Sequence, residues 1–139
     1  MSKIYTAQVT SKGGREGFVK SSDGKLNMKL SQPSDSADSA TNPEQLFAAG
    51  YAACFHSALK MVAKNKDLNT EGSEVMAEVS LHKEDPAGFR LSVVLNVSVP
   101  GLDAEQVQTL ADQAHQVCPY SKATRGDIDV EVKTAATQR

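Results

Sequence analysis

One stretch decides the fold: residues 41–64 read TNPEQLFAAGYAACFHSALKMVAK. Asn42 can act as a helix N-cap, Pro43 suits the first helical turn, and Gln45 takes the third position of a capping box. We therefore predict a helix that begins near Pro43. From Leu46 to Val62, apolar and small residues cover most of its circumference, and no charge interrupts them before Lys60. Such a helix of roughly 30 Å should be buried, with the other elements packed against it.

Length and composition limit the class of protein. The 139 residues are 40% hydrophobic and 23% charged, with a net charge of −2, which predicts a single globular domain over residues 1–139. The lysines are scattered, the N-terminal residues have no apolar run of signal-peptide length, and the long apolar stretch is interrupted by Gly50 and His56. We expect a cytoplasmic protein that binds neither nucleic acid nor a membrane. Two cysteines are too few for a secreted disulfide scaffold but enough for a redox cycle.

The residues before the helix predict a small antiparallel meander. Period-two alternation and turn residues indicate three strands, at Ile4–Thr10, Phe18–Lys20 and Leu26–Leu30. A turn at Gly13-Gly14 should separate the first two. The polar stretch Gln32–Ala40 should be a loop, and a loop there could cover a site.

The residues after the helix predict two long strands, a second helix and a last strand. The strands are expected at Val75–Leu81 and Leu91–Val99, joined by a turn at residues 85–88. Asp103 should cap the second helix, which Cys118-Pro119 should end; a strand over Ile128–Val132 and a frayed tail over Thr134–Arg139 follow. This order of elements predicts an α+β fold.

The two cysteines are the first candidates for chemistry. A buried free cysteine often serves only as a small apolar residue, and Cys54 lies far beyond the first helical turn, where the helix dipole would favour a thiolate. Its activation would therefore need a nearby cation, for which Arg15 in the GGREG turn is a candidate, although Arg15 could equally be a solvated turn residue. Cys118, where a helix stops at a proline, would suit a resolving thiol or could simply fill a helix end.

Other site chemistries find less support. Cys54 and His56 lack the spacing of two metal ligands on one helix face, while His82 and His115 stand alone on other elements, so no metal site is expected. No nucleophile elbow or phosphate-binding glycine loop is present. The cysteines are 64 positions apart rather than in a C-x-x-C pattern, so any redox pair has to meet through the fold.

The runs TNPEQLFAAGYAACFHSAL and VCPYSKATRGDIDV, together with the GGREG turn, resemble the organic hydroperoxide resistance proteins, within the superfamily of the osmotically inducible protein C. The resemblance implies an OsmC-like fold, in which antiparallel sheets wrap around a long buried central helix in an intertwined homodimer. It implies a thiol peroxidase without a bound cofactor, reduced by a dihydrolipoyl group on a lipoylated protein. Cys54 would be the peroxidatic cysteine, Cys118 the resolving one, and Arg15 with Glu44 the activating pair.

Two positions depart from that family's pattern. Lys122 and Asp127 stand where asparagine is expected in the second run, which changes the local charge around the Cys118 segment. The thiol itself is unaffected.

The chemistry of such a site follows from its residues. A Cys54 thiolate would attack a peroxide oxygen, release an alcohol and form a sulfenic acid, which Cys118 would convert to a disulfide. An apolar wall would favour alkyl, aryl or fatty-acid hydroperoxides over hydrogen peroxide. Its candidates, each of which could equally be an ordinary core residue, are Met28, Phe47, Tyr51, Phe55 and Tyr120. Two alternatives remain: a non-enzymatic module that binds an apolar small molecule, and a redox sensor.

The spacing of Glu44 and Cys54 raises a geometric problem. Ten residues along one helix separate them by about 15 Å, too far for one Arg15 to contact both. Either the helix breaks at Gly50, or Arg15 and Glu44 beside a given Cys54 come at least partly from a partner chain. We favour the partner chain.

Overall fold

The computed structural model describes residues 1–33 and 39–134, and its chain forms two compact units, Met1–Leu46 and Phe47–Arg139. The order of elements is α+β, as predicted. The loop expected over Gln32–Ala40 lies partly outside the described residues, as does the tail after Thr134. A single domain over residues 1–139 stays a prediction.

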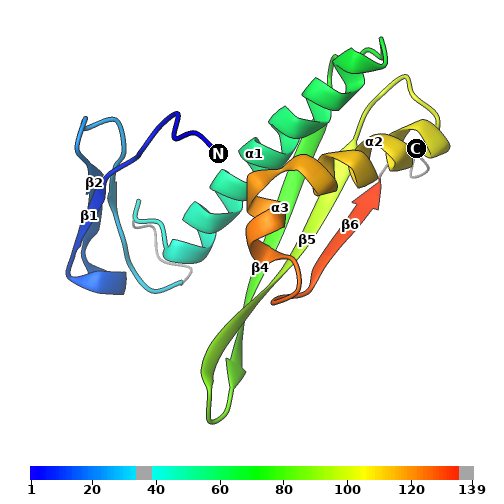
Figure 1. Cartoon of the computed structure of the whole chain (residues 1–139). Coiled ribbons are helices and arrows are strands. Elements are labelled where there is room, and N and C mark those ends of the chain that lie inside the picture. The colour runs from blue at the N-terminus through cyan, green and yellow to red at the C-terminus, as the bar shows by residue number, and fades with distance from the viewer. Residues whose placement is uncertain (34–38, 135–139) are drawn as a thin grey trace. The chain divides into compact units, whose positions relative to one another are not determined.

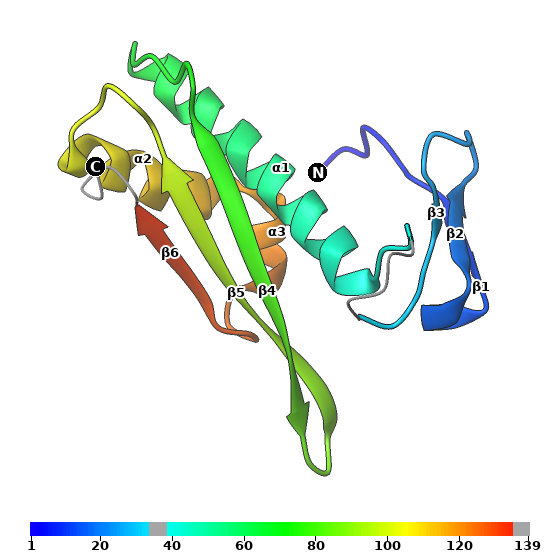
Figure 2. The same cartoon turned by 180° about the vertical axis from the view of Figure 1, so that it is seen from behind.

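The first unit contains an antiparallel sheet in the order β1-β2-β3, drawn in blue in Figures 1 and 2. Its strands are β1 (Val9–Lys12), β2 (Phe18–Ser21) and β3 (Asn27–Lys29). The prediction that the first strand covers Ile4–Thr10 was wrong. The tight turn at residues 13–17 sets the register, because it pairs Lys12 directly with Phe18 and so moves the strand toward the turn.

The sheet of the first unit has almost no interior of its own. The side chains of β1 and β3 are exposed, and among the described residues of this unit only Leu30 is fully buried. Three short strands without a covered apolar face are not stable alone in water. The sheet therefore needs a cover that it does not provide itself.

Helix α1 (Pro43–Asn65) begins where the sequence predicts and runs without interruption through Gly50. The Asn42 side-chain oxygen accepts a hydrogen bond from the backbone N–H of Gln45 at 2.9 Å, which caps the helix. In the single chain its burial is confined to one face, which carries Tyr51, Phe55, Ala58, Leu59 and Ala63. The opposite face, with Ala49, Ala53, Ser57 and Met61, is exposed. The sequence predicted a helix buried on all sides, and in the single chain α1 is buried on one side only.

The second unit contains a three-stranded sheet in the order β4-β5-β6. Strands β4 (Glu74–Glu84) and β5 (Gly88–Ser98) form the predicted antiparallel hairpin. Strand β6 (Val130–Thr134) pairs with β5 in parallel, so this sheet is mixed rather than wholly antiparallel as expected. Two helices between β5 and β6 carry the chain back across the sheet, which is the connection that a parallel pair requires.

Helix α2 (Ala104–Val117) has the predicted capping box, in which Asp103 and Gln106 bond each other's backbone N–H groups. Helix α2 ends at Cys118-Pro119, as predicted, but the short helix that follows was not predicted. A short helix α3 (Pro119–Thr124) starts there at once, because a proline that ends one helix also fits the first turn of the next.

The helices cover one face of the β4-β5-β6 sheet, as the opposite views of Figures 1 and 2 show. The core is formed by α1, β5 and α2, and its fully buried side chains include Tyr51, Leu59, Leu95, Val97 and Leu110. By length and composition alone α1 would also qualify as a membrane-spanning helix, a test that core helices of soluble proteins pass as well.

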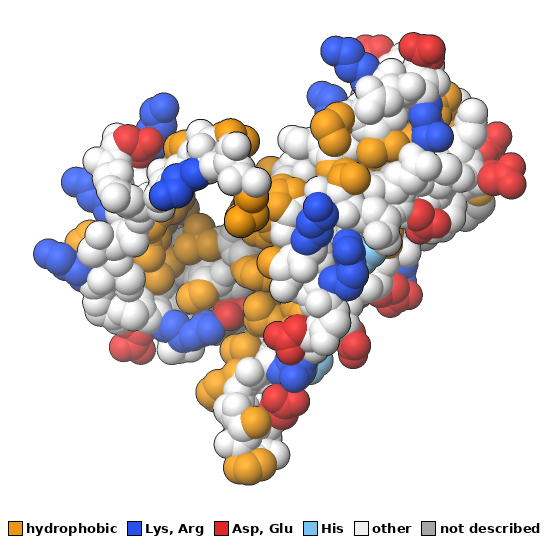
Figure 3. Space-filling view, in the orientation of Figure 1, with side chains coloured by type: hydrophobic (Ala, Val, Ile, Leu, Met, Phe, Trp, Pro, Cys, Tyr) orange, Lys and Arg blue, Asp and Glu red, His pale blue; other side chains and the backbone are white. Residues whose placement is uncertain are grey.

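The described part of the chain leaves several large apolar side chains exposed. Met61 on α1 and Met76 on β4 are 54% and 56% exposed, and Phe89 on the hairpin is 69% exposed. Figure 3 shows apolar side chains at the tip of this hairpin, at the bottom of the view.

Candidate active site

The first unit holds Arg15 in a fixed position. Arg15 lies in a 3-10 turn (Gly14–Glu16) between Gly13 and Gly17. Gly13 has a left-handed backbone (φ 83°), and a Cβ atom at Gly17 would lie 1.7 Å from the carbonyl oxygen of Lys12. Glycine is required at both positions, so the GGREG pattern is what a turn this tight needs.

The guanidinium of Arg15 binds the carboxylate of Glu44 through two parallel hydrogen bonds. Nη1 donates to Oε1 at 2.8 Å and Nη2 donates to Oε2 at 2.7 Å. The hydrogen bond lowers the pKa of Glu44 and raises that of Arg15. This bidentate geometry fixes the plane of the guanidinium. The sequence pointed to both residues, and the structure brings them together at the start of α1.

The second unit brings the two cysteines together. Sγ of Cys118 lies 3.7 Å from Sγ of Cys54, and both thiols are free. Cys54 is in the middle of α1, whereas Cys118 lies at the junction of α2 and α3. A disulfide bond of ~2.05 Å needs only a small further approach of the sulfur atoms. Cys118 is fully buried and Cys54 partly exposed, so a molecule from solvent meets Cys54 first.

Burial raises the pKa of the Cys54 thiol, and the hydrogen bond with Cys118 raises it further. The backbone N–H of Tyr120 acts in the opposite direction. The surroundings of Cys54 therefore favour the protonated thiol. A peroxide-reactive thiolate needs an additional cation beside it.

Aromatic rings gather around the cysteine segments in the second unit. The ring centroids of Phe47, Tyr51 and Tyr120 lie 5.7 to 6.4 Å from one another. Tyr51 and Phe55 are fully buried, whereas Tyr120 is 39% exposed. Met28, the fifth residue of the predicted apolar wall, belongs to β3 in the first unit.

The sequence did not reveal a buried polar group beside Cys118. The hydroxyl of Ser121 lies 2.8 Å from that of Tyr51 and 2.8 Å from Nδ1 of His115. His115 was expected to stand alone. The spacing of His115, Cys118 and Ser121, three residues apart in each case, is the one signal that could have suggested their proximity.

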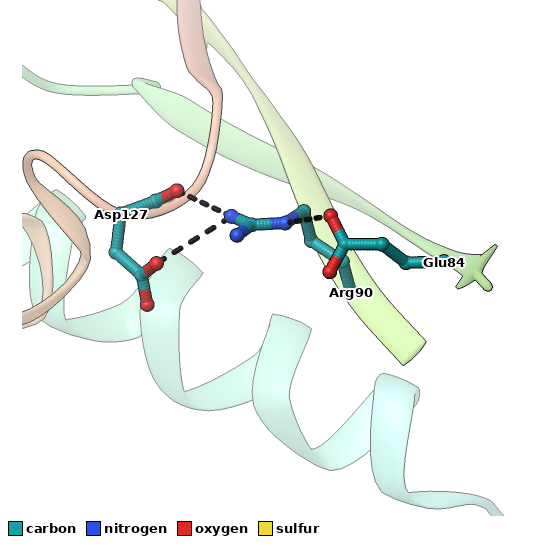
Figure 4. Close-up of polar contacts among 3 residues, drawn as sticks. All are labelled: Glu84, Arg90 and Asp127. Atoms are coloured by element: carbon teal, nitrogen blue, oxygen red, sulfur yellow. Dashed lines mark hydrogen bonds and ion pairs between the residues drawn. The ribbon is translucent and has the colours of Figure 1, made fainter. Parts of the chain in front are cut away.

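The loop after α3 is held by Arg90 of β5, as Figure 4 shows. Arg90 Nε donates to Glu84 Oε2 at 2.9 Å, and Nη1 donates to the main-chain oxygen of Asp127 and lies 3.5 Å from its Oδ1. Asp127, at a position where asparagine was expected, thus has a cationic partner. Lys122, the other departure, is exposed on α3.

The described residues contain no group of three or more His, Cys, Asp or Glu side chains that could hold a metal ion. The described residues thus offer a pair of thiols in the second unit and the Arg15–Glu44 ion pair in the first unit.

Comparisons with known proteins agree with this geometry. The family model described as OsmC-like protein matches residues 35–133. The organic hydroperoxide resistance protein of Xanthomonas axonopodis pv. citri is 52% identical over 136 residues, which cover 95% of each chain. The crystal structure of the organic hydroperoxide resistance protein OhrB of Bacillus subtilis is 47% identical, with a TM-score of 0.87 over 94% of this chain and 98% of that one.

A third similarity is to an organic hydroperoxide resistance protein OsmC from Legionella pneumophila. Its crystal structure is 42% identical, with a TM-score of 0.89 over 96% of this chain and 98% of that chain. The likeness therefore extends over both cysteine segments, the GGREG turn and nearly the whole fold. The chain belongs to the OsmC-like family, among the organic hydroperoxide resistance proteins.

Proposed function

We propose that this protein is a cysteine-based peroxidase that reduces organic hydroperoxides to alcohols as part of an oxidative stress response. The observation that carries the proposal is the 3.7 Å separation between the partly exposed thiol of Cys54 and the buried thiol of Cys118. Relatives with about half of their residues identical are named for organic hydroperoxide resistance, which supports the same chemistry.

In this proposal the Cys54 thiolate attacks the terminal oxygen of ROOH. The O–O bond breaks, RO⁻ leaves and takes up a proton to become ROH, and Cys54 becomes a sulfenic acid. The sulfur of Cys118 then attacks the sulfur of Cys54, a disulfide forms, and hydroxide leaves with the Cys118 proton as water. Two electrons pass from the thiols to the peroxide in each cycle.

A dithiol reductant must then restore both thiols and itself become a disulfide. The family resemblance favours a dihydrolipoyl group carried by a lipoylated protein, with no cofactor bound to the enzyme. It also favours a cytoplasmic location, where such carriers and a reducing thiol pool occur together.

The activating cation in this proposal is Arg15, oriented by Glu44. Burial raises the pKa of Cys54, so a guanidinium beside the sulfur would supply the stabilisation that the thiolate lacks. Glu44 and Cys54 lie on one uninterrupted helix and are separated by about 15 Å along its axis. We therefore assign the Arg15 and Glu44 that serve a given Cys54 to the partner chain of a homodimer.

Two further observations support a homodimer. Among its described residues the first unit buries only Leu30, and one face of α1 leaves Ala49, Ala53 and Met61 exposed. A second copy would cover apolar surface of this kind. Each dimer would then contain two equivalent sites.

The substrate class follows from the aromatic rings. Phe47 and Tyr120 are partly exposed and would contact the organic tail, with the buried Tyr51 and Phe55 behind them. Met28 would join this wall from the first unit. Each CH2 group that leaves water contributes about 0.8 kcal/mol, so two or three of them favour an alkyl hydroperoxide over hydrogen peroxide by more than about tenfold.

The test is turnover of the purified protein with dihydrolipoamide, comparing cumene hydroperoxide with hydrogen peroxide. We expect kcat/KM to be more than about tenfold higher for cumene hydroperoxide. Binding of an apolar ligand without turnover would favour the binding-module alternative. A single oxidation that no dithiol reverses would favour a redox sensor.

A further inference from the structure

A chain of buried hydroxyl groups joins three helices beside the thiol pair. Ser121 on α3 lies between Tyr51 on α1 and His115 on α2, with both polar contacts at 2.8 Å. The Tyr51 hydroxyl also lies 3.3 Å from Oγ1 of Thr124, which itself donates to the main-chain oxygen of Ser121 at 3.2 Å. Ser121 and Tyr51 are fully buried.

The residues that form the hydroxyl contact have the same spacing in the sequence as the two cysteines. Tyr51 precedes Cys54 by three residues on α1, and Ser121 follows Cys118 by three residues. Three residues are close to one helical turn, so the two members of each pair lie on the same side of their segment. The hydroxyl contact and the sulfur contact therefore join the same two segments, about one turn apart.

The Cys118 segment has limited support from its own backbone. Cys118 has extended dihedral angles (φ −65°, ψ 125°) where α2 ends and the six-residue α3 begins. Its backbone N–H bonds the carbonyl of Ala114, and its carbonyl accepts from the N–H of Lys122. These bonds tie Cys118 to α2 and α3. Toward α1 the backbone of the segment offers the N–H of Tyr120, which bonds Cys54, and the Ser121 hydroxyl adds a second link at Tyr51.

We propose that Ser121, held between Tyr51 and His115, is a positioning residue that keeps the sulfur of Cys118 opposite that of Cys54. The inference rests on the proposed function, in which Cys118 resolves the oxidised Cys54. Buried hydroxyl groups are costly to leave unpaired, so the contacts of Ser121 restrict how α3 can move away from α1. The effective concentration of one thiol at the other is thereby raised.

Thiol–disulfide equilibrium measures this effective concentration directly and needs no peroxide. Oxidised glutathione accepts two electrons from Cys54 and Cys118, which leaves a protein disulfide and two molecules of reduced glutathione. The fraction of protein disulfide across a series of glutathione buffers gives the equilibrium constant, with mass spectrometry of alkylated thiols as the readout.

The test compares Ser121→Ala and Tyr51→Phe with the unmodified protein. We expect each variant to lower the equilibrium constant of the disulfide by about tenfold, a potential less negative by roughly 30 mV. Because both variants break the same contact, the double variant should lose no more than the larger single loss. Tyr51→Phe removes one oxygen atom and serves if Ser121→Ala does not fold.

Two controls separate positioning from general stability. Ser92→Ala removes a similar contact, 2.7 Å from His82 on the β4–β5 hairpin, and should leave the equilibrium constant unchanged. His115→Asn keeps a polar atom near the position of Nδ1, so it can still bond Ser121 and should retain the disulfide equilibrium constant. His115→Leu removes this partner and should lower the equilibrium constant.

Unchanged constants in Tyr51→Phe, Ser121→Ala and His115→Leu would overturn the positioning role, even if their melting temperatures fall. An equal fall in Ser92→Ala would overturn it as well, because the effect would not depend on the place of the contact. Absence of hydroperoxide turnover would contradict the proposed function and would leave this equilibrium result standing.

Discussion

The ring of Tyr120 lies against the backbone of helix α1 at Gly50, where an added Cβ atom would come within 2.9 Å of the tyrosine oxygen. A glycine in the middle of a helix is unfavourable by about 1 kcal/mol relative to alanine. Close approach of Tyr120 accounts for its presence, and the helix does not break there. The absence of a side chain at Gly50 therefore allows the Tyr120 ring to pack close to the thiols.

Gly50→Ala should raise or preserve the free energy of unfolding, by up to about 1 kcal/mol, while displacing Tyr120. Tyr120 is 39% exposed and can move outward. We expect KM to change more for cumene hydroperoxide than for the smaller tert-butyl hydroperoxide, as steady-state kinetics would reveal. The double variant Gly50→Ala, Tyr120→Phe lacks the tyrosine oxygen that lies closest to the added Cβ, so its change in KM should be smaller. Equal changes for both substrates would show that Tyr120 does not contact the organic tail.

Cys54→Ser should abolish turnover, whereas Cys118→Ser should allow about one oxidation per site and then stall or over-oxidise. The physical reason is access, because Cys118 is fully buried and Cys54 is not. Mass spectrometry after one equivalent of peroxide distinguishes sulfenic acid, sulfinic acid and disulfide. Equal loss of the first oxidation in both variants would contradict this order.

Mixed dimers test whether the site is shared. Cys54→Ser chains and Arg15→Ala chains should each be inactive, yet subunit exchange should restore activity, because one site in each mixed dimer regains both residues. Native mass spectrometry checks that mixed dimers form. Mixing Cys54→Ser with Cys54→Ala chains is the control and should stay inactive. Mixed dimers without activity would place Arg15 and Cys54 of one chain in the same site.

Acid should destabilise the fold through two histidines. Burial lowers the pKa of both His56 and His115 below the ordinary value of 6.5. The unfolded chain then binds more protons than the folded one below about pH 6.5, so the free energy of unfolding falls as the pH drops from there through the folded-state pKa values. Urea unfolding at about pH 7.5 and about pH 5.5 measures the loss.

The variants His56→Asn and His115→Asn should each remove part of this pH dependence, and the exposed His82→Asn is the matched control. The chosen pH range lies above the region where Glu44 titrates, since Arg15 holds the pKa of that carboxyl below its ordinary value. An unchanged slope in both histidine variants would assign the acid sensitivity to other groups.

Asp127→Asn, which introduces the residue expected from the family resemblance, should leave turnover and the melting temperature nearly unchanged. The Asp127 side chain is 77% exposed and its carboxylate lies 3.5 Å from Arg90, which also donates to the main-chain oxygen of Asp127. Exposed ion pairs of this kind contribute little. Arg90→Met removes both of these contacts and the ion pair with Glu84, so it should have the larger effect on melting temperature. A clear loss in Asp127→Asn alone would assign a role to the carboxylate itself.

The helices and the hairpin were open to sequence prediction because their signals are local. Asn42 and Asp103 are good N-caps, and the alternation through Val93, Leu95 and Val97 indicates a strand with one buried face. The pairing direction of β6 was not accessible, since the same alternation fits a parallel or an antiparallel neighbour.

Resemblance to a family indicated Cys54, Cys118, Arg15 and Glu44 before their geometry was known, whereas the contacts of Ser121 were not predictable. The contact with Tyr51 joins residues 70 positions apart in the sequence, and only the three-residue spacing from His115 to Cys118 and Ser121 hinted at the other contact. The shift of β1 had a similar cause, because the geometry of the turn around Arg15 outweighed the apolar alternation before it.

The scarcity of buried side chains around β1, β2 and β3 would couple the folding of this sheet to protein concentration in the proposed homodimer. If the cover of this sheet is a second copy, its free energy of unfolding depends on mass action, and each tenfold dilution removes about 1.4 kcal/mol. The β4-β5-β6 unit has its own core, so it depends on this term only through the exposed face of α1. Dilution would then release the turn that carries Arg15 while the thiol pair stays folded.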